Sequence, residues 1–249
     1  MKVKPSLDQR LDARKRPESP IVMRQDWDKL LFLHWEVSAE TIQQRLPPQL
    51  TVDTFEGKAY LGIVPFSMEK VRPRFCPPVH GISWFLELNL RTYVFDENGV
   101  PGVWFFSLDC NQWLAVKLAR TLFHLPYQHA KMSITEKNKQ YHYQSNLEKD
   151  TIQQEYIYPS QFAKETQLAH PNSLEFFLLE RYRLFSQKRS GKIYAGMVHH
   201  QPYRYSKCDC EVYSTRPFAL NGFEEPSLPP ASLLIAEKVE VDIYPLKRN

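Results

Sequence analysis

The sequence lacks any long run of apolar residues, and it contains only eight glycines and four cysteines in 249 residues. A helix that spans a bilayer needs about 20 apolar residues in succession, so we expect no membrane segment. The N-terminal region has no apolar core of a secretory signal, which favours a cytoplasmic protein. The cysteines (Cys76, Cys110, Cys208 and Cys210) do not follow the spacing of a disulfide framework, so reduced thiols are expected.

The chain also has little excess charge of either sign, with a formal net charge of +4. Much of this excess lies in residues 1–18, so the remainder is close to neutral and gives no basic face for nucleic acid. We therefore expect a flexible basic tail over 1–18 that is dispensable for folding, followed by a single domain over 19–249. The tail's charged residues are Lys2, Lys4, Arg10, Arg14, Lys15 and Arg16 against Asp8, Asp12 and Glu18.

Several motifs that would indicate a cofactor or a metal are missing. The sequence contains no glycine-rich phosphate loop, no nucleophile elbow and no HExxH motif, so no cofactor is expected. His199 and His200 precede Cys208 and Cys210, but structural zinc sites use cysteine pairs separated by two to four residues. The single residue between these two cysteines is typical of a strand, and we expect no metal site.

Strand patterns dominate what is present. Residues 84–94 alternate between two faces, with apolar residues on one face and Glu87, Asn89 and Arg91 on the other. Further strands are expected at 27–37, 50–55, 59–68, 102–109, 127–136, 140–146, 152–158, 182–187, 192–200, 205–213 and 233–244. Helices are expected at 38–46, 110–124 and 173–181, with Asp109 as the N-cap of the second. These elements predict an α+β fold with a large, mostly antiparallel sheet.

The strands 84–95 and 102–109 are expected to form a hairpin. If Phe95 pairs with Val103, then Ser107 lies opposite Arg91 and Asp109 lies opposite Asn89. The polar row formed by Glu87, Asn89 and Arg91 would then gain Ser107 and Asp109. Two interpretations fit this face: a solvent-exposed surface with an Arg91–Asp109 ion pair, or an enclosed patch in a ligand pocket, which the flanking aromatic residues favour.

Local patterns in the chain resemble the acetoacetate-decarboxylase-like superfamily, and most closely its uncharacterised YqjF-like branch. No one pattern is specific, but their order and number along residues 21–246 carry the resemblance. They are LHWEV at 33–37, LPPQL at 46–50, GIVPF at 62–66, ELNLRTYV at 87–94, FFSLD at 105–109, LPY at 125–127, FLLERY at 177–182, HHQP at 199–202 and VDIYPL at 241–246.

This resemblance implies a sheet closed into a cone or barrel around a pocket. It also places Tyr127 and Gln128 where the decarboxylase carries two adjacent lysines. Schiff-base chemistry requires an amine, made nucleophilic by a neighbouring cation, and neither residue supplies one. The fold is therefore expected without the Schiff-base reaction.

The resulting hypothesis is a small-molecule-binding protein that acts on a carbonyl or carboxylate compound. Glu87 would be the base, Tyr127 a second catalytic group and Arg91 the anchor for an anion, with Asn89, Ser107 and Asp109 also binding the ligand. A module that binds a ligand without turnover fits the sequence equally, and so does a protein-interaction module that uses the tail and a sheet edge. A homo-oligomer is also compatible with the sequence.

Overall fold

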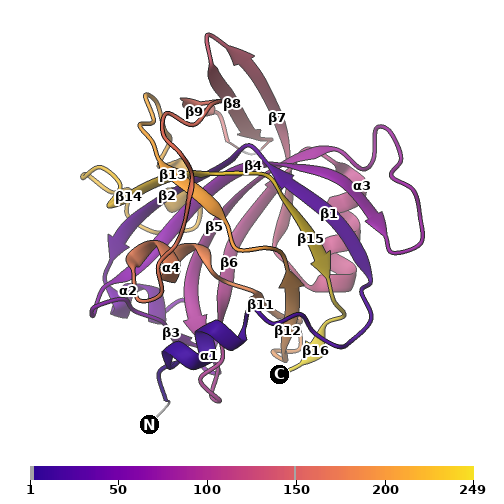
Figure 1. The fold of residues 1–249 in the computed structure, drawn as a ribbon, viewed down its shortest axis with the longest axis vertical. Coiled ribbons are helices and arrows are strands. Elements are labelled where there is room, and N and C mark those ends of the chain that lie inside the picture. The colour runs from indigo at the N-terminus through magenta and orange to yellow at the C-terminus, as the bar shows by residue number, and fades with distance from the viewer. Residues whose placement is uncertain (1–2, 149) are drawn as a thin grey trace.

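The strand β5 (Phe85–Phe95) lies at the centre of the sheet in this computed structural model, which describes residues 3–148 and 150–249 (Figure 1). It pairs with β4 (Ala59–Pro73) on one side and with β6 (Pro101–Cys110) on the other. Both faces of β5 are covered, so every residue except Arg91 is buried. The predicted alternation therefore separates two packed layers, and the polar row does not face solvent.

Seven strands pair in a ring that starts and ends at β5. The pairings run from β5 to β4, β1, β15, β12, β11, β6 and back to β5. In Figure 1, β1 and β15 cross the view on the near side, with β5 and β6 behind them. The four further members of the ring are β1 (Met23–Asp28), β11 (Arg183–Gln187), β12 (Ile193–His199) and β15 (Val239–Ile243).

The sheet is mixed: most of its pairings are antiparallel, but it also contains parallel pairings that the sequence did not predict. The strand β6 pairs in parallel with both β11 and β7, whereas the other pairings of the described strands are antiparallel. The strands expected at 127–136, 140–146 and 152–158 are present as β7, β8 and β9, which form an antiparallel meander. The remaining strands are β2 (Leu30–Val37), β3 (Thr51–Val52), β7 (Tyr127–Lys137), β8 (Gln140–Leu147), β9 (Gln154–Pro159), β10 (Gln167–Leu168), β13 (Arg204–Lys207), β14 (Ser232–Ala236) and β16 (Lys247–Arg248).

The hairpin of β5 and β6 has a register that differs from the expected one. Phe95 pairs with Pro101, and an irregularity between Leu90 and Arg91 shifts the rest of the ladder by one residue. An extra residue of this kind reverses which face each later side chain occupies. Ser107 consequently lies opposite Leu90, on the face away from the polar row.

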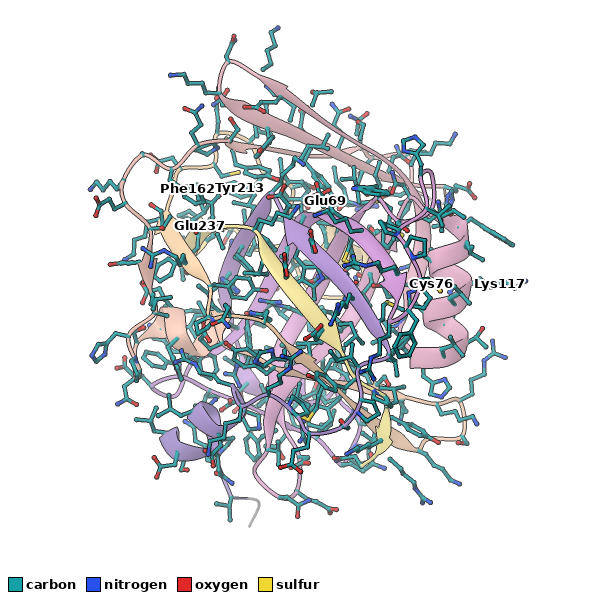
Figure 2. The ribbon with its side chains drawn as sticks, turned by 45° about the vertical axis from the view of Figure 1, so that its right-hand side comes forward. Glu69, Cys76, Lys117, Phe162, Tyr213 and Glu237 are labelled. Atoms are coloured by element: carbon teal, nitrogen blue, oxygen red, sulfur yellow. The ribbon has the colours of Figure 1, made fainter. Side chains whose placement is uncertain are left out.

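The helix expected at 110–124 is shorter and begins later. The strand β6 continues to Cys110, and α3 (Trp113–Leu118) is capped by Gln112 rather than by Asp109. The helix then widens into a π-helical turn, η1 (Ala119–Phe123). Figure 2 shows this helical segment at one side of the sheet, with Lys117 pointing outward. Among the described helices, none is long and apolar enough to cross a membrane.

The other helices are short. Ser38 caps α2 (Ala39–Gln43) and Ser173 caps α4 (Leu174–Leu179), so both helices start where the sequence predicts. The helix α5 (Arg216–Leu220) was not predicted.

The tail contains the helix α1 (Leu7–Asp12) and makes charged contacts with the body of the protein (Figure 1). Arg10 donates two hydrogen bonds to Asp53, at 2.7 and 2.8 Å, and Arg14 donates one to Glu180 at 3.1 Å. Both acceptors are buried. This arrangement differs from the flexible arm expected from the composition of residues 1–18.

Candidate functional site

A cavity of about 540 Å³ lies inside the ring of strands. All seven strands of the ring contribute side chains to its wall, and α3 and η1 contribute further ones. Most of the wall is apolar, with a small number of polar groups that include Glu87, Tyr127, Arg91, Arg181 and Arg183. A large apolar cavity with a few convergent polar groups is typical of a ligand-binding site.

Glu87 is the buried acid of this cavity, with only 3% of its surface exposed. Tyr127 Oη donates a hydrogen bond of 2.5 Å to Glu87 Oε2, and Asn89 Nδ2 donates one of 3.2 Å to Oε1. Burial raises the pKa of Glu87 to about 7, while the two hydrogen bonds and the charge of Arg91 act in the opposite direction. Near neutral pH both protonation states are therefore populated, as a general acid or base requires.

Tyr127 is positioned by the segment that leads from η1 into β7. Its backbone carbonyl accepts a 2.6 Å hydrogen bond from Arg120 Nε, and Tyr127 pairs in parallel with Leu108 of β6. This pairing brings the start of β7 beside the strand that neighbours Glu87. Burial and the adjacent Glu87 raise the pKa of Tyr127 well above its ordinary value, so the phenol stays a proton donor.

Arg91 is half-buried and lines the same cavity. Its Nη2 lies 3.4 Å from both Tyr93 Oη and the carbonyl oxygen of Leu178, and its guanidinium lies 5.3 Å from the centre of the Phe32 ring. Within the described residues, Arg91 Nε has no hydrogen-bond partner and no carboxylate lies within ion-pair distance. The charge is thus left available to an anionic ligand.

The orientation of Arg91 is supported by a buried pair behind it. Tyr93 Oη lies 2.7 Å from His34 Nε2. Burial and the charge of Arg91 lower the pKa of His34 well below its ordinary value, so the ring is neutral and shares a hydrogen bond with the phenol. Gly62 leaves room for this ring, because a Cβ there would lie 2.9 Å from His34 Cδ2.

Ser107 and Asp109 do not join the polar row, which corrects the predicted site. Ser107 Oγ instead accepts a 2.9 Å hydrogen bond from Asn221 Nδ2. Asp109 pairs with Leu88 and lies on the face opposite Glu87, so the Arg91–Asp109 ion pair of the solvent-exposed interpretation is not formed. Burial, together with the nearby charge of Glu87, raises the pKa of Asp109 to about 7.

Arg181 is a cavity residue that the sequence did not assign to the site. Its Nη1 donates a 2.9 Å hydrogen bond to Asp53 Oδ2. Burial lowers the pKa of Arg181 to about 10, against the opposing effect of Asp53. An arginine that follows the apolar helix α4 after one intervening residue was the available signal, but its partner lies far away in the sequence.

The structure does not bring together a metal site in the part of the chain that it describes. Across residues 3–148 and 150–249, no three His, Cys, Asp or Glu side chains are arranged to hold a metal ion.

Comparison with known proteins identifies the family to which this chain belongs. Residues 24–240 match the DUF2071 family, which is described as an uncharacterized conserved protein. The chain is 35% identical over 234 residues to the uncharacterized protein YqjF of Bacillus subtilis, and the match covers 93% of this chain and 94% of that protein.

Two solved structures show the same fold at low sequence identity. Acetoacetate decarboxylase from Legionella pneumophila aligns with a TM-score of 0.62 at 11% identity, over 94% of this chain and 90% of that one. The enduracididine biosynthesis enzyme MppR, complexed with the condensation product of pyruvate and imidazole 4-carboxaldehyde, aligns with a TM-score of 0.62 at 11% identity, over 92% and 90% of the two chains. The chain therefore belongs to the DUF2071 family, and it has the fold of the acetoacetate-decarboxylase-like proteins.

Proposed function

We propose that this protein binds a small carboxylate that also carries a carbonyl group, and that it transfers a proton to or from the bound compound. The observation that carries the proposal is the Glu87–Tyr127 hydrogen bond of 2.5 Å inside the cavity, with burial raising the pKa of Glu87 to about 7. Arg91 lines the same cavity and would hold the carboxylate of the ligand.

The scaffold in this proposal is a single domain over residues 19–249, closed into a cone or barrel around the cavity. The ring of seven pairings supports this closure, and so does the cavity wall, to which every strand of the ring contributes. Such a scaffold holds the polar groups on strands rather than on mobile loops, which favours a preorganised site.

The proposed step is a tautomerisation at the carbon beside the carbonyl. Glu87 in its carboxylate form takes a proton from that carbon, and the C–H electron pair moves into an enolate whose charge rests on the carbonyl oxygen. Tyr127 turns its O–H from Glu87 to this oxygen and stabilises the charge. Return of the proton from Glu87 to carbon or oxygen gives the keto or the enol form and restores the carboxylate.

A Schiff-base decarboxylation is not part of the proposal. In the described parts of the chain, the residues that line the cavity include no lysine. Tyr127 occupies the position where the resemblance places one of the lysines, and its phenol is engaged by Glu87. Without an amine in the cavity, a covalent imine with a 3-oxo acid has no site at which to form.

The test is hydrogen exchange at the carbon beside the carbonyl of two 2-oxo acids, pyruvate and 2-oxooctanoate, followed in D₂O by proton NMR. We choose 2-oxo acids because MppR is complexed with a condensation product of pyruvate. The wild type should accelerate exchange, and Glu87→Gln should lower the rate roughly a hundredfold or more. Glu240→Gln changes an exposed carboxyl group and serves as the matched control.

Two outcomes would count against proton transfer. Exchange at the same rate in Glu87→Gln and in the wild type would remove Glu87 from the reaction. If either acid gives saturation-transfer signals but no hydrogen exchange at the carbon beside the carbonyl, the protein binds the acid without turnover.

A further inference from the structure

The cavity is much larger than a three-carbon acid requires. Its volume of about 540 Å³ falls in the range of sites that bury drug-sized ligands, about 300–1,000 Å³. Apart from the polar groups, its wall consists mainly of aliphatic and aromatic side chains. An apolar space of this kind gains little from water and favours an apolar occupant.

The apolar wall reaches solvent at a rim. Four residues that line the cavity are apolar and yet substantially exposed: Val22 (37%), Ile82 (44%), Leu118 (47%) and Leu122 (59%). Leu118 and Leu122 lie one turn apart at the junction of α3 and η1, and Gln112 at the start of α3 donates a 2.6 Å hydrogen bond to the carbonyl of Gly81, next to Ile82. An exposed apolar rim that continues into an apolar cavity indicates where an apolar group enters.

The polar and apolar groups follow an order along β5. From Arg91 toward the start of the strand, Glu87 follows four residues away and Phe85 begins the strand. Side chains two apart on a strand lie on the same face, so these three point into the same space. Ile82, at the rim, precedes Phe85 by three residues.

We propose that the natural ligands are straight-chain carboxylates with an apolar chain of about eight carbons or more. The carboxylate lies against Arg91, the next few carbons pass Glu87 and Tyr127, and the alkyl chain runs along Phe85 to the rim. The carboxylate head group of this ligand rests on the proposed function. The alkyl chain follows from the apolar wall and the rim of the cavity alone.

The experiment is isothermal titration with butanoate, octanoate and decanoate, each below its micelle concentration. Each added methylene that enters an apolar site should tighten binding about fourfold, so octanoate, with four more methylenes, should bind roughly two-hundredfold more tightly than butanoate. Affinities that do not change with chain length would overturn the proposal.

Substitution at the rim tests where the alkyl chain of the ligand leaves the cavity. The double variant Leu118→Asn with Leu122→Asn should lower the ratio of decanoate affinity to butanoate affinity at least fivefold. Leu168→Asn changes an exposed leucine on β10 that does not line the cavity, and it should leave that ratio unchanged. A rim variant that alters the sedimentation coefficient but not the ratio would make the rim a contact between copies of the chain, which also overturns the proposal.

Arg91→Met separates this inference from the function on which it rests. It should weaken binding of every carboxylate while the dependence on chain length persists. If octanoate and octan-1-ol bind equally well and Arg91→Met has no effect, the apolar chain site stands and the carboxylate anchor is wrong. If butanoate binds through Arg91 but longer acids bind no better, the anchor stands and the chain site is wrong.

Discussion

Tyr127 donates a 2.5 Å hydrogen bond to Glu87, although forty residues separate them in the sequence. The contact depends on β6, which pairs antiparallel with the strand of Glu87 and in parallel with the strand of Tyr127. The parallel pairing arises because the chain crosses through α3 and η1 before it returns as β7. The same crossover places α3 and η1 over the cavity, so one connection both forms the dyad and covers it.

Glu87→Gln should make the protein more stable at alkaline pH. Burial raises the pKa of Glu87 from its ordinary value of 4.5 to about 7, so folding favours the protonated acid. This contribution is fully present below pH 4.5 and is lost as the pH rises through about 7, for a total of about 3 kcal/mol. The amide keeps an acceptor for Tyr127, and its NH₂ group can donate to Asn89 Oδ1, which has no partner among the described residues.

Urea unfolding at pH 4.5 and at pH 8 measures this effect. The Glu87→Gln variant should match the wild type at pH 4.5 and exceed it at pH 8, whereas Glu240→Gln should follow the wild type at both. If Glu87→Gln is less stable than the wild type by the same amount at both pH values, burial does not penalise the carboxylate.

Tyr127→Phe and Arg91→Met should both raise the pKa of Glu87 further, and Tyr127→Phe should have the larger effect. The hydrogen bond from Tyr127 lowers the pKa of Glu87 more than the charge of Arg91 does, because the phenol contacts the carboxylate directly. Carbon-13 NMR of the labelled glutamate carboxyl group gives the titration midpoints. Tyr194→Phe, outside the cavity wall, is the control, and a larger shift in Arg91→Met than in Tyr127→Phe would reverse the order.

The alternation of residues 84–94 was sufficient to predict that Glu87, Asn89 and Arg91 share a face, since period two depends only on the strand itself. The structure places Glu87 and Arg91 at the cavity, and Asn89 against Glu87. Tyr127 was assigned through the resemblance, because nothing local to its sequence indicates a partner forty residues away.

The residues that the sequence misplaced depend on pairing between segments. Ser107 and Asp109 were assigned from a hairpin register, and the irregularity beside Arg91 moved both to the other face. Arg181 could not be placed because its partner Asp53 lies 128 residues away. The parallel pairings of β6 likewise follow from long-range packing, which local alternation does not encode.

No lysine of this protein should form a covalent adduct with 3-oxobutanoate. The described residues of the cavity wall include no lysine, so the imine that borohydride reduces has no amine from which to form. Intact-mass spectrometry after treatment with 3-oxobutanoate and sodium borohydride should show the unmodified mass, with a Schiff-base decarboxylase as the positive control. A reduced adduct on any lysine peptide would refute this.

Removal of residues 1–18 should destabilise the protein, in contrast to the dispensable tail that the composition predicts. Arg10 is paired through both terminal nitrogens with Asp53, whose side chain is fully buried. Burial alone would raise the pKa of Asp53, but Arg181 and Arg10 outweigh burial and hold it below its ordinary value. Loss of Arg10 leaves this carboxylate with Arg181 alone, which should cost about 1–3 kcal/mol at pH 7.

Arg10→Met isolates this contact from the rest of the tail, and Arg16→Met is its matched control, because Arg16 pairs with Asp242 at an exposed position. At pH 7 we expect Arg10→Met to lower the melting temperature by roughly 2–10 °C and Arg16→Met to change it little. Because the pKa of Asp53 is depressed in the folded state, the stabilisation is present above the ordinary value of 3.8 and is lost as the pH falls through the folded pKa. The difference in melting temperature between Arg10→Met and the wild type should therefore become smaller at acidic pH. Equal melting temperatures for the wild type, Arg10→Met and a protein that starts at Ser19 would show that the tail is dispensable after all.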